Sequence, residues 1–191
     1  MIAGFALLTV SPLAAQDARL AARLPQPIAR EVQSLVDSAE RAGLPGEPLV
    51  LKALEGQSKD ADEARILSAV RGLLGRLAVG RQMLGEQSSA EELVAAAAAL
   101  RAGATPATLG SLRALRGDRP LVVPLSVLAD LLTVGVPAEQ AWNSVRDMAS
   151  QGAPDKAFLE LREKYGGAAE SPRSLPPGEE HPPTTPVPGR P

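Results

Sequence analysis

The 191-residue chain carries a net charge of −2, with 45% hydrophobic residues, 2% aromatic residues and no cysteine. This weak net charge and the scarcity of aromatic rings argue against a nucleic-acid-binding or anionic-membrane surface. The lack of cysteine excludes disulfides, thiolate nucleophiles and cysteine-based zinc sites, and the length suffices for one domain with appended segments.

The chain begins with an uncharged apolar run, MIAGFALLTVSPLAAQ, which ends in small residues. Such a run is too short to span a bilayer comfortably and is typical of a secretory signal peptide, with cleavage after Ala15 or Gln16. No Lys or Arg precedes the run, so an uncleaved anchor and a misassigned start codon stay open as alternatives. We expect a signal peptide over residues 1–16, a linker or short helix over 17–27, and export to the periplasm or the medium of a bacterium.

From residue 28 to residue 165, apolar residues recur with the spacing of amphipathic helices. The first stripe is Ile28, Val32, Leu35, Val36 and Ala39, and a later one is Ile66, Val70, Leu73, Leu74 and Leu77. The longer helix is expected to begin near Asp60, and Ser89 with Glu92 predicts a capping box at the start of the next. No segment alternates as a strand does. The sequence PLVVP at 120–124, bounded by prolines, is interpreted as an extended linker.

Four glycines, each followed within three residues by a proline, separate these helices. Apolar residues stand seven and four positions before each glycine, on one edge of a helix. Glycine tolerates the left-handed backbone that ends a helix, and proline suits the first turn of the next. Each stretch therefore predicts the end of one helix followed directly by the start of the next, which we call a joint. Gly56 and Gly85 are interpreted as two further joints, without proline. The four glycines are Gly43, Gly103, Gly135 and Gly152.

These six joints predict an all-α domain of about eight short helices over residues 28–165. The helices would stack as antiparallel hairpins, in degenerate helix-Gly-x-Pro-helix repeats, because each hairpin alone leaves an apolar stripe exposed. Residues 166–191 contain eight prolines and two large aliphatic residues, Leu175 and Val187. Such a segment cannot offset its ordering entropy by burial, so a disordered, Pro-rich C-terminal tail is predicted.

Motifs that would indicate catalysis or cofactor binding are weak or incomplete. GRLAVGRQ, residues 75–82, nearly matches a phosphate-binding loop, but the lysine, the hydroxyl residue and the preceding strand that the motif needs are missing. We interpret the segment as a helix that frays through Gly72, Gly75 and Gly80. The single histidine, His181, stands in the predicted tail. We therefore expect no enzyme activity, no metal and no cofactor.

Two groups of residues are candidates for contact with a partner. One is a stretch of four arginines with no acidic residue between Glu63 and Glu86. It is either a solvated helix face or a surface that binds negative charge. That charge would come from an acidic partner or from Glu179 and Glu180 of the tail. The other is three aromatic residues, which either form the core of the last hairpin or a binding hot spot. The arginines are Arg65, Arg71, Arg76 and Arg81, and the aromatic residues are Trp142, Phe158 and Tyr165.

These observations favour a non-enzymatic protein–protein interaction or scaffold module of the cell envelope, with a protein partner that the sequence does not identify. We expect that the protein does not bind nucleic acid. We also expect no membrane-spanning helix once the leader has been cleaved. The alternative is a carrier of a small hydrophobic ligand or lipid, held in a cavity between helices lined by Leu, Val and Ala.

Overall fold

The computed structural model describes residues 12–169, and this part of the chain contains nine helices and no strand. The all-α prediction is thus confirmed for these residues. Residues 1–11 and 170–191, with most of the predicted signal peptide and tail, lie outside the described residues. The helices are α1 (Pro12–Arg23), α2 (Gln26–Arg41), α3 (Glu47–Ser58), α4 (Glu63–Leu84), α5 (Ala90–Ala102), α6 (Pro106–Arg116), α7 (Val122–Thr133), α8 (Ala138–Ser150) and α9 (Asp155–Ala169).

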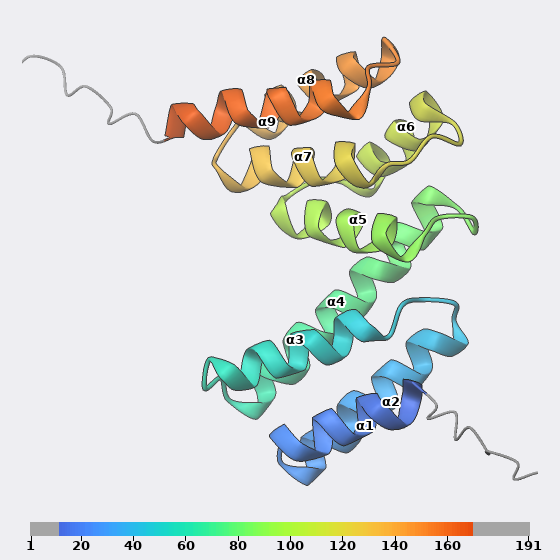
Figure 1. Ribbon diagram of the computed structural model, residues 1–191, viewed down its shortest axis with the longest axis vertical. Helices are drawn as coiled ribbons and strands as arrows, with labels where there is room; N and C mark the ends of the chain where they lie inside the picture. Colours follow the sequence, from blue (N-terminus) through green and yellow to red (C-terminus); the bar gives the residue numbers. More distant parts are fainter. Residues whose placement is uncertain (1–11, 170–191) are drawn as a thin grey trace, which may run out of the picture.

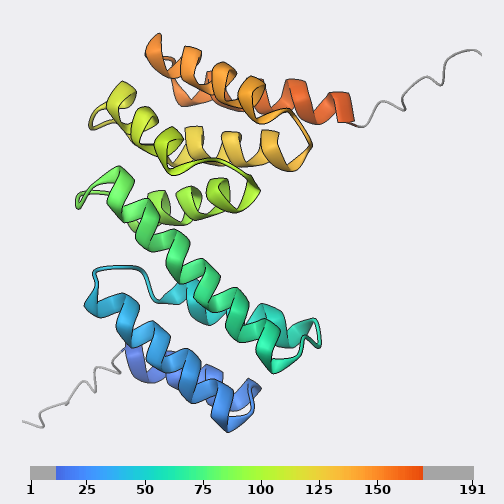
Figure 2. The same cartoon turned by 180° about the vertical axis from the view of Figure 1, so that it is seen from behind.

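The helices stack in two layers, with the odd-numbered helices in one layer and the even-numbered helices in the other (Figures 1 and 2). Helices two apart in the chain pack within a layer: α1 with α3, α2 with α4, α4 with α6, α5 with α7, α6 with α8, and α7 with α9. Helices α3 and α5 are not among the well-packed pairs. The odd layer is therefore interrupted between them.

Two apolar clusters form the core, one on each side of this interruption. The first cluster joins α1 to α4 and includes Leu93 and Ala97 of α5, and the second joins the end of α4 to α5 through α9. The 22-residue helix α4 crosses between them, since Leu77 is buried in the first cluster and Leu84 in the second. The predicted fraying of this helix is wrong. Helix α4 continues through Gly80 without a break. A Cβ on Gly80 would lie 3.3 Å from the Cβ of Ala96, so the absence of a side chain there lets α5 pack closely against α4.

The four Gly-Pro stretches do end helices, as predicted. In each, the glycine has a positive φ, from +69° at Gly43 to +115° at Gly103. The residue after the glycine donates its N–H to the carbonyl four positions before the glycine, which is the Schellman arrangement. These bonds are Leu44 to Ala39 (2.9 Å), Ala104 to Ala99 (2.9 Å), Val136 to Leu131 (3.0 Å) and Ala153 to Met148 (3.0 Å).

The prolines follow the prediction less closely. Pro106 is the first residue of α6, whereas Pro137 and Pro154 directly precede α8 and α9. Pro45 stands before the N-cap of α3, which is Gly46. A proline just outside the helix still fixes the entry of the chain without removing an intrahelical hydrogen bond.

Two further expectations about local structure are wrong. Gly56 lies inside α3, and the residue that turns left-handed after this helix is Asp60, with φ of +52°. The role of Gly56 is tertiary, since a Cβ there would lie 2.8 Å from Ile66 of α4. The PLVVP segment is not an extended linker, because α7 begins at Val122. Pro124 stands in its first turn, where no N–H is needed.

Candidate functional site

Arginine side chains connect successive joints along one edge of the stack, the edge at the right of Figure 1. Arg81, near the end of α4, donates to the carbonyls of Glu86 (2.6 Å) and Ser88 (3.0 Å) in the joint that follows. Its second nitrogen donates to the carbonyl of Gly43 (2.8 Å), in the joint between α2 and α3. The guanidinium thus holds two neighbouring joints together.

Arg116 makes the equivalent connection higher in the stack. Its side chain is 4% exposed and donates to the carbonyl of Ala153 (2.9 Å), the carbonyl of Pro120 (3.2 Å) and Oδ1 of Asp155 (3.1 Å). The guanidinium carbon lies 5.3 Å from the centroid of the Phe158 ring. These contacts fix the joint after α6 against the joint after α8.

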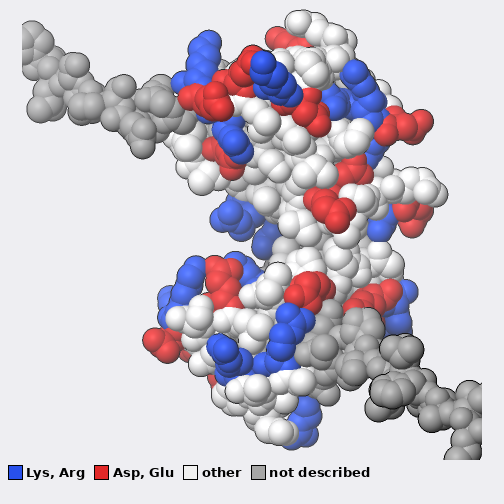
Figure 3. Space-filling view, viewed as in Figure 1, with Lys and Arg blue, Asp and Glu red and all other residues white. Residues whose placement is uncertain are grey.

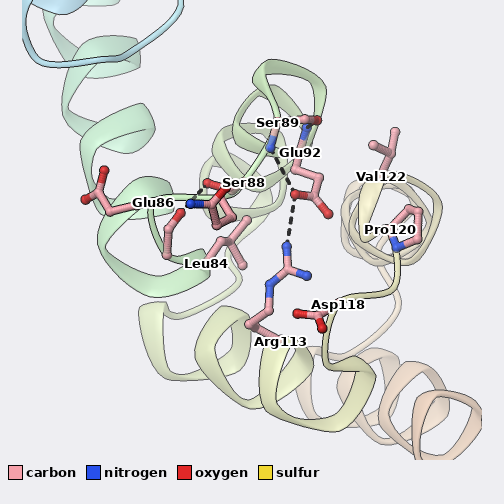
Figure 4. A pocket seen from close by; sticks show the side chains of 11 residues that line it. Leu84, Glu86, Ser88, Ser89, Glu92, Arg113, Asp118, Pro120 and Val122 are labelled. Atoms are coloured by element: carbon pink, nitrogen blue, oxygen red, sulfur yellow. Dashed lines mark hydrogen bonds and ion pairs between the residues drawn. The ribbon is translucent and has the colours of Figure 1, made fainter.

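Between these two connections lies a pocket of about 610 Å³ (Figure 4), which is lined by the α4–α5 joint and by the ends of α6 and α7. Glu92 is its most connected side chain, only 8% exposed. The carboxylate accepts hydrogen bonds from the N–H of Leu121 (2.8 Å), the N–H of Ser89 (3.1 Å) and Nη2 of Arg113 (2.9 Å). The predicted capping box of Ser89 and Glu92 is confirmed.

The bonds of Glu92 determine what this pocket can do chemically. Burial raises the pKa of Glu92, but the hydrogen bonds from Leu121, Ser89 and Arg113 outweigh it, and the net pKa is lowered. A carboxylate that stays ionised and fully bonded is a poor proton donor or acceptor. Within residues 12–169, no group of His, Asp or Glu is placed to hold a metal ion. Glu92 therefore links α5 to Arg113 of α6 and to Leu121, which precedes α7.

A second concavity, which we call the Val94 groove, lies where α3 and α5 fail to pack against each other. Its volume is about 490 Å³ and its walls are mostly apolar. Val94 is 41% exposed, whereas Ala95 beside it is buried. Two carboxylates stand at the groove, Glu91 and Glu47, and the latter is bonded to Arg19 (2.7 Å). The apolar wall consists of Pro45, Pro48, Ala90, Val94, Ala95, Ala98 and Val122.

The structure does not bring the four predicted arginines into one patch. Arg65 and Arg71 form ion pairs with exposed carboxylates, and Arg81 is bonded within the joints. Arg76 is half-buried, and it has no hydrogen bond or ion pair with the residues that the structure describes. Arg65 and Arg76 are eleven positions apart, so they share a face of α4 but stand about three turns from each other, whereas Arg71 and Arg81 leave the helix on other faces.

The three aromatic residues all belong to the second core cluster. Phe158 is fully buried beneath Arg116. Trp142 and Tyr165 are half-buried; Trp142 lines a small cavity of about 190 Å³, and the hydroxyl of Tyr165 accepts a hydrogen bond from Gln140 (3.1 Å). The exposed parts of Trp142 and Tyr165 remain available for contact. Sequence reasoning missed the Val94 groove, whose residues come from three separate helices.

Comparison of the chain with protein-family models, with characterised proteins and with solved structures found no match. Of the helices in the described range, none is long and apolar enough to cross a bilayer.

Proposed function

We propose that the chain is a non-enzymatic protein-binding module of the bacterial cell envelope, and that its partner inserts an apolar helix into the Val94 groove. A single observation carries this proposal: an apolar groove lies where the odd layer of helices is interrupted. Stacked helices normally cover such surface with the next helix. A helix from a partner protein would take the place between α3 and α5 that no helix of this chain fills.

The size and lining of the groove suit this mode of binding. A volume of about 490 Å³ accepts a few side chains, which is what an amphipathic helix presents at i, i+3 and i+4. Val94 and Val122 lie on two adjacent helices and give the groove two aliphatic anchors. Apolar anchors in a desolvated pocket dominate the affinity of most protein interfaces.

The charge at the groove indicates the chemistry of the partner. Hydrogen bonds from its own backbone N–H and from the Ser89 hydroxyl lower the pKa of Glu91, so this carboxylate is ionised at neutral pH. The Glu91 carboxylate beside an apolar wall favours a partner with Lys or Arg next to its apolar residues. We therefore propose a basic amphipathic helix as the ligand.

Export remains part of the proposal and is compatible with the fold. Leu20 of α1 and Leu24, the residue after this helix, belong to the first core cluster, and both lie on the C-terminal side of the predicted cleavage site. Cleavage after Gln16 would leave both in place. We also propose that the stack consists of degenerate hairpin repeats, in support of which four joints share one hydrogen-bond geometry.

A carrier of a small hydrophobic ligand or lipid is the alternative. Such a carrier encloses its cargo, whereas the Val94 groove is open to solvent. This openness favours the protein ligand. Thermal stabilisation by fatty acids that is lost on substitution of Val94 would instead support the carrier.

The proposal is tested by capture from the envelope fraction of the native organism, with residues 17–191 as bait. Val94→Glu places a charge in the groove, and Val134→Glu is the matched control, since Val134 is 48% exposed on another part of the stack. We expect one protein to be enriched by the unchanged bait and by Val134→Glu, and to be lost with Val94→Glu. Equal enrichment by all three baits, or by none, would contradict the proposal.

A further inference from the structure

The face of α5 that lines the Val94 groove changes its charge from one end of the helix to the other. Glu91, Val94 and Ala98 line the groove and lie on one face, at spacings of three and four residues. Arg101 follows Ala98 by three positions on the same face, in the last turn of the helix. The face therefore begins with an exposed carboxylate, continues with apolar side chains and ends with an exposed guanidinium group.

A second arginine stands beside the basic end of this face. Helices α4 and α5 run antiparallel (Figure 1) and meet at Gly80, where a Cβ would lie 3.3 Å from Ala96. Arg76 precedes Gly80 by one turn of α4. Arg101 follows Ala96 by little more than one turn of α5, so the two arginines adjoin each other. Burial and the charge of Arg101 both lower the pKa of Arg76.

The two arginines have no anion to bind among the described residues. No hydrogen bond or ion pair joins Arg76 or Arg101 to a residue within 12–169, and Nε of Arg76 is buried without an acceptor. Figure 3 shows a notch at the left of the molecule, between its lower and upper halves, with basic side chains on the upper wall. Helix α5 ends at this side of the stack (Figure 1), so a ligand can reach its basic end from solvent.

A helix that lies along this face of α5 meets both charges. Glu91 and Arg101 are ten residues apart, which is about 15 Å along a helix that rises about 1.5 Å per residue. A ligand helix of about three turns therefore reaches from one charge to the other and covers Val94 between them. Carboxylates of the ligand would lie at the arginine end, and its Lys or Arg side chains would lie at the Glu91 end.

The dipole of the ligand helix determines its direction. Acidic side chains stabilise the first turn of a helix, and basic side chains stabilise its last turn. A ligand with an acidic first turn at the two arginines and a basic last turn at Glu91 satisfies its own dipole and the charges of the face together. Such a ligand runs antiparallel to α5, so the positive end of each dipole adjoins the negative end of the other.

We infer that the helix that enters the Val94 groove has an acidic first turn, an apolar face and a basic last turn, and that it binds antiparallel to α5 with its acidic turn at Arg76 and Arg101. This inference rests on the proposed function, because it specifies the ligand of the same groove. The apolar and basic residues are those of the proposed ligand, and the acidic first turn is what the two arginines add.

Two stapled helical peptides of identical composition serve as probes, since isolated helices of this length are unstable in water. Both carry the same apolar stripe. The ordered peptide has two glutamates in its first turn and two lysines in its last turn, whereas the mixed peptide has one glutamate and one lysine at each end. We expect the full chain to bind the ordered peptide about 2- to 30-fold more tightly at low salt, because exposed ion pairs are individually weak. The difference should disappear at 1 M salt, where charges are screened beyond about 3 Å.

A charge reversal and a spin label test the placement of the acidic turn. Arg101→Glu should remove the preference for the ordered peptide. Arg65→Glu is the matched control and should leave the preference unchanged, since Arg65 is 82% exposed in the first turn of α4. A nitroxide label on the first residue of the ordered peptide should broaden the amide resonance of Arg101 more than that of Glu91. Circular dichroism checks that each variant is folded.

Val94→Glu separates this inference from the proposed function, because it should abolish the binding of both peptides. Equal binding of the two peptides that is lost with Val94→Glu would overturn the inference and leave the groove as a protein-binding site. Stronger broadening at Glu91 than at Arg101, or an equal effect of Arg65→Glu and Arg101→Glu, would overturn it in the same way. Binding of neither peptide would also overturn the inference, and the capture experiment would then decide on the proposed function alone.

Discussion

Removal of the Glu92 carboxylate should destabilise the upper half of the stack. Glu92→Ala leaves the buried N–H of Leu121 without an acceptor, which costs about 1–3 kcal/mol. It also deprives Arg113, 23% exposed, of a charged partner, and this loss is smaller because water reaches the guanidinium. We expect the free energy of unfolding to fall by about 2–4 kcal/mol in total.

Two further variants separate the charge from the hydrogen bonds. Glu92→Gln keeps an acceptor for Leu121 but loses the charge that faces Arg113, so a loss of about 1–2 kcal/mol is expected. Glu86→Gln removes an equal charge from an exposed side chain nearby (Figure 4), and should change stability by less than about 0.5 kcal/mol. Urea denaturation, followed by the fluorescence of the single tryptophan, measures all three.

The pH dependence gives an independent check of the same carboxylate. The pKa of Glu92 is lower in the folded protein than its ordinary value of 4.5. Its contribution is therefore complete above about pH 4.5 and is lost as the pH falls through the folded pKa. The unchanged protein should lose stability on acidification more steeply than Glu92→Gln does. Equal slopes, or a Glu92→Ala variant within about 0.5 kcal/mol of the unchanged protein, would refute the reasoning.

Three further predictions concern other parts of the stack. Arg116→Ala should lower the free energy of unfolding by about 2–4 kcal/mol, measured in urea. The buried guanidinium donates to the partly buried carbonyls of Ala153 and Pro120, and these lose their donor. A loss below about 0.5 kcal/mol would contradict this. Gly80→Ala should lower the free energy of unfolding by about 1–2 kcal/mol, because the new methyl group overpacks the contact with α5. Gly75 lies in the same helix with open space around it, so Gly75→Ala should raise the free energy of unfolding by about 0.5–1 kcal/mol. Thermal melts of both variants show whether the two effects have opposite signs. Hydrogen bonds from Lys52 and from a neighbouring lysine lower the pKa of Glu55 to about 2, and Lys52→Met should raise it toward 4.5 in an NMR titration.

The sequence was sufficient where local physics decides the structure. The Schellman stops at Gly43, Gly103, Gly135 and Gly152 were predictable, because the apolar edge before each glycine and the left-handed turn at it are set by neighbouring residues. The Ser89 capping box was predictable for the same reason. Such features need no information from distant parts of the chain.

The predictions from the sequence were wrong where contacts between distant parts of the chain override the local preference of a residue. Gly56 and Gly80 resemble helix breakers, yet both lie inside helices because a neighbouring helix packs against them. The connections of the site were equally unpredictable. Glu92 bonds Arg113 from 21 positions away, and Arg116 bonds Asp155 from 39 positions away, and no periodic pattern announces either pair. The Val94 groove exists only because α3 and α5 do not pack, which is a property of the whole stack.

Photo-crosslinking from defined positions tests the central claim most directly. A crosslinking amino acid replaces Val94 in the groove, and replaces Val134 or Trp142 in two control proteins, each expressed in the native organism. The proposed function predicts that position 94 alone crosslinks to one partner protein, through a segment with apolar and basic residues. Crosslinks from position 142 but not from position 94 would move the contact to the last helices. An absence of crosslinks from position 94 in an exported, folded protein would contradict the claim.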